Sequence, residues 1–154
     1  MWENVGLAVR SHLQRNYSLR SSCRSDATVQ SRVSEILDAV GLSSRVLVMA
    51  GSLSHGERRA LELGIGLGLE PSAMLLDEPM AGVSAHDRFA LRDLILKLRQ
   101  DTGLTIVLVE HDVELVLDIS DRITVMHQGA VIADGSPGAI KDDAAVRASY
   151  LGAG

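Results

Sequence analysis

The chain has 154 residues, of which 46% are hydrophobic and 23% charged, and this composition is that of a globular protein. The formal net charge of -5 argues against nucleic-acid binding through bulk positive charge, and a single cysteine excludes an internal disulfide. No apolar run approaches the roughly 20 residues that span a bilayer, and we expect no secretory signal near Met1 because Glu3 interrupts the segment.

Three helices are predicted in the first part of the sequence. Apolar residues recur at helical spacings in each, and capping or glycine residues mark several of their ends. The helices span residues 2–14, a segment from Asp26 or Thr28 to Gly41, and a segment from Ser54 to just before Pro71. The polar, serine-rich stretch 15–27 indicates a loop, and its Cys23 is expected to be inert.

Strands and helices alternate in the rest of the sequence. Residues 73–77 and 104–109 are short apolar runs between turn residues, which predicts two buried strands. Helices are predicted over 84–103, with Phe89 on the apolar face, and over 113–120 and 144–151; residues 122–134 predict a hairpin that turns at Gln128 and Gly129. This alternation is typical of an α/β fold with an at least partly parallel sheet.

Carboxylates follow the first predicted strand directly, as Asp77 and Glu78, and His111 follows the second. The carboxyl ends of neighbouring parallel strands meet at one rim of a sheet, where ligands commonly bind. This set suits phosphoryl transfer to water: one carboxylate holds Mg²⁺ through its waters, the second orients water, and the histidine senses a phosphate. The alternative is a solvated strand end without a chemical role.

The segment "LSHGE" places Ser54 and Gly56 where a helix begins. Backbone N–H groups and the helix dipole favour an anion there, and Gly56 would let a phosphate approach the backbone closely. The alternative is an ordinary capped helix.

The order of "LSHGE", "MLLDEP", "AGVS" and "VEHD" resembles the ATP-binding subunits of ABC transporters. "WENV" near Met1 and "ASYLG" near the other end resemble the branch that imports branched-chain amino acids or urea. The resemblance implies a partial P-loop NTPase (ABC ATPase) fold with an incomplete, mainly parallel sheet. It also implies a helical subdomain over residues 1–70 and the C-terminal part of a RecA-like core over residues 71–154.

The resemblance also implies roles for individual residues. Asp77 would serve Mg²⁺, Glu78 the attacking water and His111 the γ-phosphate. A signature motif would contact ATP held by a second subunit, and it comprises Ser54, His55, Gly56 and Glu57. A D-loop would line the dimer interface, and it comprises Ala81, Gly82, Val83 and Ser84. The implied partners are that second ATP-binding subunit and transmembrane permease subunits, at the cytoplasmic face of the inner membrane.

A phosphate-cradling loop of the form G-x-x-x-x-G-K-[ST] is absent from the sequence, because neither Lys97 nor Lys141 follows a glycine. We therefore expect the chain alone not to hydrolyse ATP, and we expect the strand at "RITVM" to face a gap in the sheet. A truncated gene, one part of a split protein and a misassigned start at Met1 would each account for this. Two other functions stay open: a catalytically inactive ABC-like binding module, and a fragment of a non-transport ABC ATPase.

Overall fold

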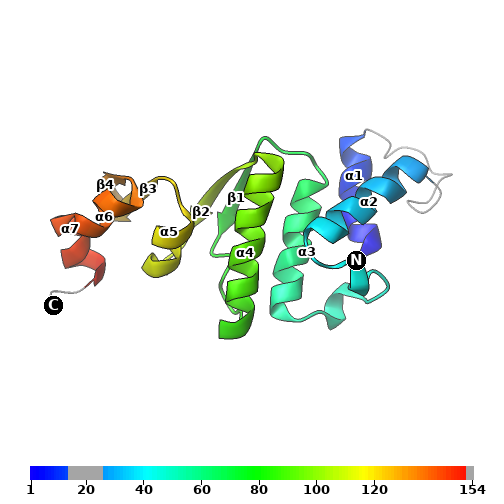
Figure 1. Ribbon diagram of the computed structural model, residues 1–154, viewed down its shortest axis with the longest axis horizontal. Coiled ribbons are helices and arrows are strands. Elements are labelled where there is room, and N and C mark those ends of the chain that lie inside the picture. The colour runs from blue at the N-terminus through cyan, green and yellow to red at the C-terminus, as the bar shows by residue number, and fades with distance from the viewer. Residues whose placement is uncertain (14–25, 152–154) are drawn as a thin grey trace. The chain divides into compact units, whose positions relative to one another are not determined.

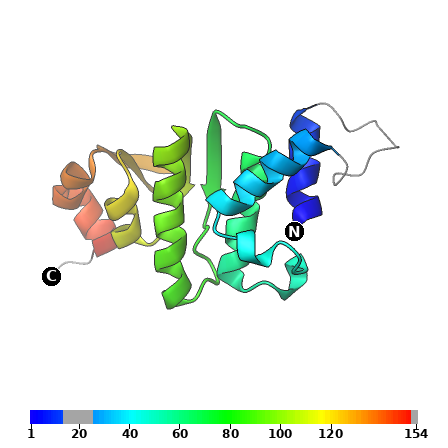
Figure 2. The ribbon, with the colours of Figure 1, turned by 45° about the vertical axis from the view of Figure 1, so that its right-hand side comes forward.

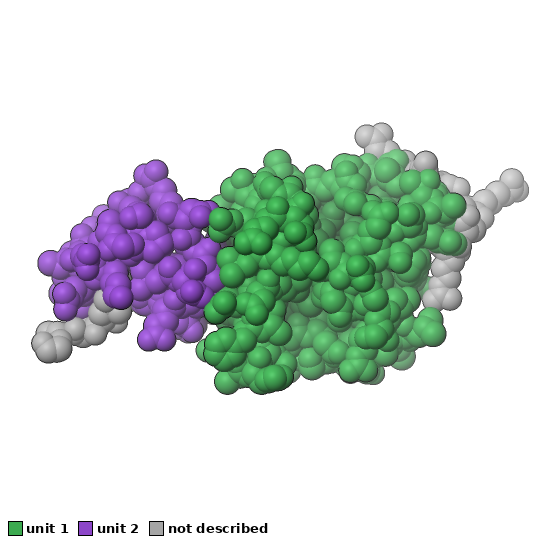
Figure 3. All heavy atoms as spheres, viewed as in Figure 1, with its two compact units in different colours: residues 1–107 green, residues 108–154 purple. Residues whose placement is uncertain are grey.

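The computed structural model describes residues 1–13 and 26–151, so most of the predicted loop, including Cys23, lies outside the described residues. The chain divides into two compact units, residues 1–107 and 108–154 (Figure 3). The boundary predicted near residue 70 concerns functional subdomains and stays a prediction.

Helices dominate the first unit. Its elements are α1 (Trp2–His12), α2 (Ala27–Ala39), two short 3₁₀ turns (Ser43–Arg45 and Ala50–Ser52), α3 (His55–Leu67), β1 (Ala73–Asp77) and α4 (Ala85–Thr102). Strand β2 (Thr105–Val109) runs across the boundary. The second unit continues with α5 (Val113–Ile119), β3 (Ile123–His127), β4 (Ala130–Gly135), α6 (Pro137–Asp142), α7 (Ala144–Val146) and a last π-helical turn (Arg147–Leu151).

The core of the first unit lies between α1, α2 and α3, and α4 lies beside α3 (Figures 1 and 2). Each of the three helices turns its apolar stripe inward. The most deeply buried side chains include Val5, Val9, Val29, Val33 and Leu37. Branched aliphatic side chains fill this core, in keeping with the low aromatic content of 3%.

Side-chain caps fix where the helices of this unit begin. The carboxylate of Asp26 accepts hydrogen bonds from the N–H groups of Thr28 and Val29, which starts α2 at its predicted place. Ser84 accepts from the N–H of Asp87 to start α4, and Gly103 ends it in the left-handed conformation at φ 66°. The predicted start of α2 and both predicted ends of α4 are therefore confirmed.

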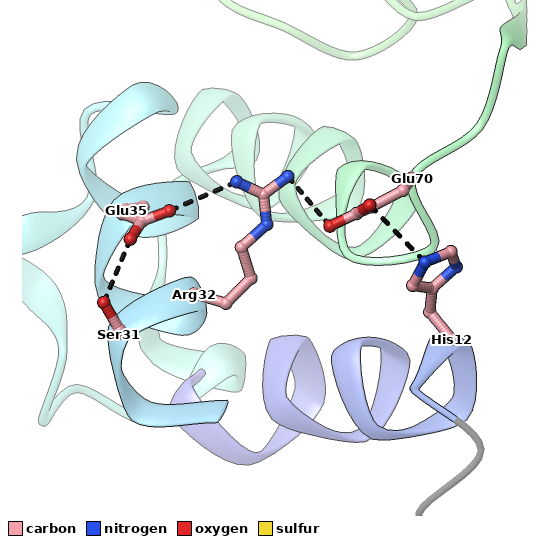
Figure 4. Close-up of polar contacts among 5 residues, drawn as sticks. All are labelled: His12, Ser31, Arg32, Glu35 and Glu70. Atoms are coloured by element: carbon pink, nitrogen blue, oxygen red, sulfur yellow. Dashed lines mark hydrogen bonds and ion pairs between the residues drawn. The ribbon is translucent and has the colours of Figure 1, made fainter. Parts of the chain in front are cut away.

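Charged side chains tie the ends of three elements together (Figure 4). Arg32 on α2 contacts Glu35 at 3.2 Å and Glu70, in the turn between α3 and β1, at 3.1 Å. His12 on α1 approaches the other oxygen of Glu70 at 3.4 Å. Glu70 has φ +49°, a conformation that disfavours side chains with a β-carbon, and its carboxylate is contacted by Arg32 and His12.

Strands β1 and β2 pair in a two-stranded sheet and are joined through α4, the kind of crossover that parallel strands require. The prediction that both strands are buried is wrong for one face: Leu75 is 71% exposed and Val107 is 50% exposed. Only alternate residues of each strand are partly covered. Among the described residues, no further strand joins this sheet, so it is incomplete, as the sequence predicted.

The prediction that Phe89 belongs to the apolar face of α4 is also wrong. Its side chain is 67% exposed, while Leu91, Ile95 and Leu98 are buried. These three residues repeat at the spacing of one narrow helical stripe, and Phe89 lies outside that stripe.

The second unit is built around the hairpin of β3 and β4, which pair antiparallel and form their own two-stranded sheet. Gln128 and Gly129 both have positive φ, which is the backbone of a type I′ turn, so the predicted turn is confirmed. Ile123, Ile140 and Val146 form the core of this unit. Helix α6 was not predicted from the sequence, although Ser136 caps it and Pro137 occupies its first turn.

Candidate functional site

The first turn of α3 carries the segment "SHGE" and is held by a reciprocal capping box. The hydroxyl of Ser54 accepts a hydrogen bond from the N–H of Glu57 at 3.1 Å, and the carboxylate of Glu57 accepts one from the N–H of Ser54 at 2.9 Å. Both ends of the predicted motif therefore have a structural role in starting the helix. The first backbone bond of the helix is made by Arg58, whose N–H donates to the carbonyl of Ser54.

Glu57 also forms an ion pair that the sequence analysis missed. Its second carboxylate oxygen lies 2.9 Å from Nε of Arg45, which belongs to the first 3₁₀ turn. The N–H of Ser54, followed by the Arg45 guanidinium, lowers the pKa of Glu57. No local pattern could have predicted this pair, because twelve positions separate the two residues.

Gly56, in the first turn of α3, packs against Asp87 of α4. A β-carbon at this position would stand 2.9 Å from Cβ of Asp87 and 3.4 Å from its carboxylate oxygen Oδ2. The absence of a side chain therefore permits helix packing as well as the close approach of an anion for which the residue was singled out. A groove of about 380 Å³ opens beside this contact, between α2, α3 and α4, and Asp38, Glu57 and Lys97 are among its lining residues.

The segment from Glu78 to Ser84 forms a tight turn between β1 and α4. The N–H of Ala81 donates to the carbonyl of Glu78 at 3.0 Å, and the N–H of Val83 donates to Met80 at 3.2 Å. Gly82 has φ +72°, and a β-carbon there would lie 3.8 Å from Nδ1 of His55. The fold therefore brings the predicted D-loop beside the first residue of the predicted signature helix.

Arg88 holds the end of this turn, and the sequence analysis missed it as well. Its Nε donates to the carbonyl of Val83 at 3.3 Å, from one turn inside α4. Val83 itself is buried, and Ser84 caps α4. The position of the turn is thus set by a side-chain bond, an apolar anchor and a helix cap.

The two carboxylates lie where the sequence predicted them, at the end of β1. Asp77 is the last residue of the strand and is exposed, and Glu78 follows it with φ +42°. A glutamate in the left-handed region is uncommon, and such strained residues cluster at functional sites. The backbone thus turns sharply at the residue expected to face the attacking water.

His111 belongs to the second unit, and its side chain is 77% exposed. The backbone N–H of His111 donates to the carboxylate of Glu110 at 3.3 Å. The predicted approach of His111 to Asp77 and Glu78 stays a prediction, because the two carboxylates belong to the other unit.

No group of three or more His, Cys, Asp or Glu side chains in residues 1–13 and 26–151 could hold a metal ion. Mg²⁺ keeps several waters and takes only one or two carboxylates beside substrate phosphates. Asp77 fits that limited role, and a closed metal cage is not required for it. None of the helices that the structure describes has the length and apolarity needed to cross a bilayer.

The helices, the capped α3, the carboxylates after β1 and the hairpin together define a class: the chain has the fold of part of an ATP-binding cassette. It superposes on a solved ATP-binding cassette of an ABC transporter, in its ADP conformation, with a TM-score of 0.76 and 25% identity, over 97% of this chain and 62% of that one. A putative metal-chelate type ABC transporter shares the fold with a TM-score of 0.82 at 18% identity, over 97% of this chain and 57% of that one.

Within that class, the chain is similar to proteins named as ATP-binding proteins of branched-chain amino acid transport. It is 36% identical to BraF of Pseudomonas aeruginosa over 97% of this chain and 61% of BraF. It is 36% identical to LivG of Escherichia coli over 84% of this chain and 51% of LivG. Residues 130–154 match the family model described as "Branched-chain amino acid ATP-binding cassette transporter". The chain thus spans between about half and two thirds of the length of these relatives.

Proposed function

We propose that the chain is part of the ATP-binding, ATP-hydrolysing subunit of an importer for branched-chain amino acids or similar small polar solutes. The observation that carries this proposal is the order of four motifs along a chain that is homologous to BraF over 97% of its length. The geometry of α3 and of the turn after β1 is compatible with the roles that this order implies.

In this proposal the chain contributes two sets of groups to ATP hydrolysis. Asp77 holds Mg²⁺ through water, and Glu78 accepts a proton from the attacking water or orients it. The N-terminus of α3, from Ser54 to Glu57, faces the phosphates of an ATP molecule that a second subunit holds. His111 contacts the γ-phosphate from the loop after β2. Mg²⁺ supplies charge neutralisation of the phosphates, and the residues of this chain supply position and proton transfer.

The proposal includes two partners and a location. The turn from Ala81 to Ser84 lies against a second ATP-binding subunit, and the assembly docks on transmembrane permease subunits at the cytoplasmic face of the inner membrane. The BraF and LivG homology supports this assignment. Residues 1–154 contain no GK[ST] segment, so in this proposal the phosphates are cradled by a P-loop outside these residues.

A chimaera tests the proposal directly. The residues of LivG that precede its match to this chain are joined to residues 1–154, and the product is expressed in Escherichia coli that lacks LivG. We expect the chimaera to hydrolyse ATP and to restore leucine uptake, and Glu78→Gln to abolish both while leaving the circular-dichroism spectrum unchanged. A folded chimaera that hydrolyses ATP without restoring uptake would contradict the importer assignment.

The isolated chain provides a second test. Phosphate contacts supply most of the positioning in phosphoryl transfer, so we expect no ATP turnover from residues 1–154 alone. Turnover that is lost in Glu78→Gln would show that the chain holds the phosphates by itself and would overturn this part of the proposal.

A further inference from the structure

The N-terminus of α3 combines features that attract an anion with features that repel one. The N–H groups of His55 and Gly56 precede the first helical hydrogen bond, and the helix dipole adds partial positive charge at this end. Yet Glu57 is in the same turn, and the carboxylate of Asp87 lies beside Gly56. Two negative side chains therefore accompany a site that is proposed to receive a triphosphate.

The Glu57 carboxylate does not extend into solvent, because both of its oxygens are bonded. One accepts from the N–H of Ser54 and the other from Nε of Arg45, each at 2.9 Å. The side chain is accordingly only 27% exposed. The pair of Glu57 and Arg45 carries no net charge. Arg45 reaches α3 from a different segment of the chain, the 3₁₀ turn Ser43–Arg45.

We infer that Arg45 is a positioning residue for the nucleotide: it holds Glu57 in the cap of α3 and cancels its charge, so that the phosphates can approach this helix. The inference rests on the proposed function, in which the same helix end faces ATP. Arg45 acts through Glu57, and it is not a catalytic residue.

If Arg45 has this role, four variants should differ in their affinity for an anion in a definite order. Arg45→Ala leaves an uncompensated carboxylate, which should weaken anion binding about three- to tenfold at low salt. Glu57→Gln keeps an oxygen that can accept from the N–H of Ser54 and leaves Arg45 unopposed, so binding should tighten by a similar factor. The double variant should return to the wild-type affinity, and Arg45→Lys, which keeps the charge, should stay within about twofold of it.

The experiment is a titration of the ¹⁵N-labelled chain with sodium triphosphate at fixed ionic strength, followed through the backbone amides of Ser54, His55 and Gly56. Arg59→Ala is the matched control, because it removes an equally local ion pair from the same helix, with Glu62 at 2.7 Å, and leaves the cap intact. The salt dependence distinguishes an effect of charge from an effect of structure. If charge is the cause, the difference in triphosphate affinity between wild type and Arg45→Ala should shrink strongly between 20 mM and 500 mM NaCl.

The outcomes separate this inference from the proposed function. Triphosphate-induced shifts at α3 that are the same in wild type and Arg45→Ala would overturn the role of Arg45 and leave the proposed anion contact standing. An absence of shifts at α3 in all variants, including Glu57→Gln, would overturn the anion contact and the role of Arg45 together. If Arg45→Ala lowers the triphosphate affinity equally at all salt concentrations, and adding Glu57→Gln does not restore it, Arg45 has only a structural role.

Discussion

Gly56 of α3 packs directly against Asp87 of α4, and a β-carbon on the glycine would stand 2.9 Å from that of the aspartate. Contacts this short do not occur between side chains, so one of the two helices would have to move. The packing of this chain itself therefore requires a glycine at position 56 of the predicted signature motif, independently of any nucleotide.

Gly56→Ala should lower the free energy of unfolding. Overpacking costs about 1–3 kcal/mol, while alanine gains about 1 kcal/mol over glycine in a helix, so we expect a net loss of about 1 kcal/mol. Denaturant melting measures it. Gly51→Ala is the control, because a β-carbon there meets no atom within 4 Å. Equal stability of Gly56→Ala and wild type would show that α3 and α4 can separate at no cost.

Acid should destabilise the fold. The N–H of Ser54 and then Arg45 lower the pKa of Glu57, and Ser31 and then Arg32 lower that of Glu35. The hydroxyl of Thr124 and then Arg122 lower the pKa of Asp134. The folded state therefore binds fewer protons than the unfolded state. Its advantage is complete above the ordinary carboxyl pKa of about 4 and is lost as the pH falls through the lower folded values.

The measurement is the denaturant midpoint from pH 7 to pH 3. It should hold steady above pH 5 and fall below about pH 4.5, and Asp134→Asn together with Glu35→Gln should flatten the fall. A midpoint that rises on acidification would contradict the direction of these pKa shifts.

The uncovered face of the two-stranded sheet should make the isolated chain associate with itself. Leu75 and Val107 are large apolar residues exposed on paired strands, and unpaired sheet edges recruit other chains. We expect sedimentation coefficients that increase with concentration, and Leu75→Ser should reduce the increase. Leu47→Ser is the control, since Leu47 is equally apolar and 88% exposed but lies outside the strands. A monomer at all concentrations would show that this face needs no cover.

A substitution in the hairpin turn of the second unit should make the hairpin more stable. Gln128 has φ +48°, where asparagine is far better accommodated than glutamine. Gln128→Asn should therefore stabilise the β3–β4 hairpin by about 0.5–1 kcal/mol. Hydrogen exchange of the hairpin amides would report the gain locally. Slower exchange should be confined to β3 and β4, and faster exchange there would contradict the turn assignment.

The sequence predicted most of the elements because their signals are local. Asp26, Ser54 and Ser84 cap the starts of helices, and a glycine ends α4. Each of these residues lies within a few positions of the helix end that it determines. The two strands were found for the same reason, but their burial was misjudged. Burial depends on which other elements pack on a strand, and an apolar run in the sequence does not show whether such elements are present.

The candidate site shows the same division. The residues Ser54 to Glu57 and Asp77 to Ser84 were found from motifs in which the spacing is fixed by short-range geometry. Arg45 and Arg88 were missed, since the first meets its partner across twelve positions and the second bonds a backbone carbonyl. Neither contact leaves a residue pattern in the sequence: the first needs the fold to bring two segments together, and the second has a backbone partner that any residue type could supply.

The left-handed backbone at Glu78 has a consequence for how this position would change over evolutionary time. A glutamate held at φ +42° costs about 1 kcal/mol or more relative to residues that adopt this conformation readily. Under the proposed function, Glu78 activates water. In a lineage that no longer needs this role, substitution to glycine or asparagine at this position would give a more stable fold. Position 78 would then be among the first places where the loss of that proposed role becomes visible in descendant sequences.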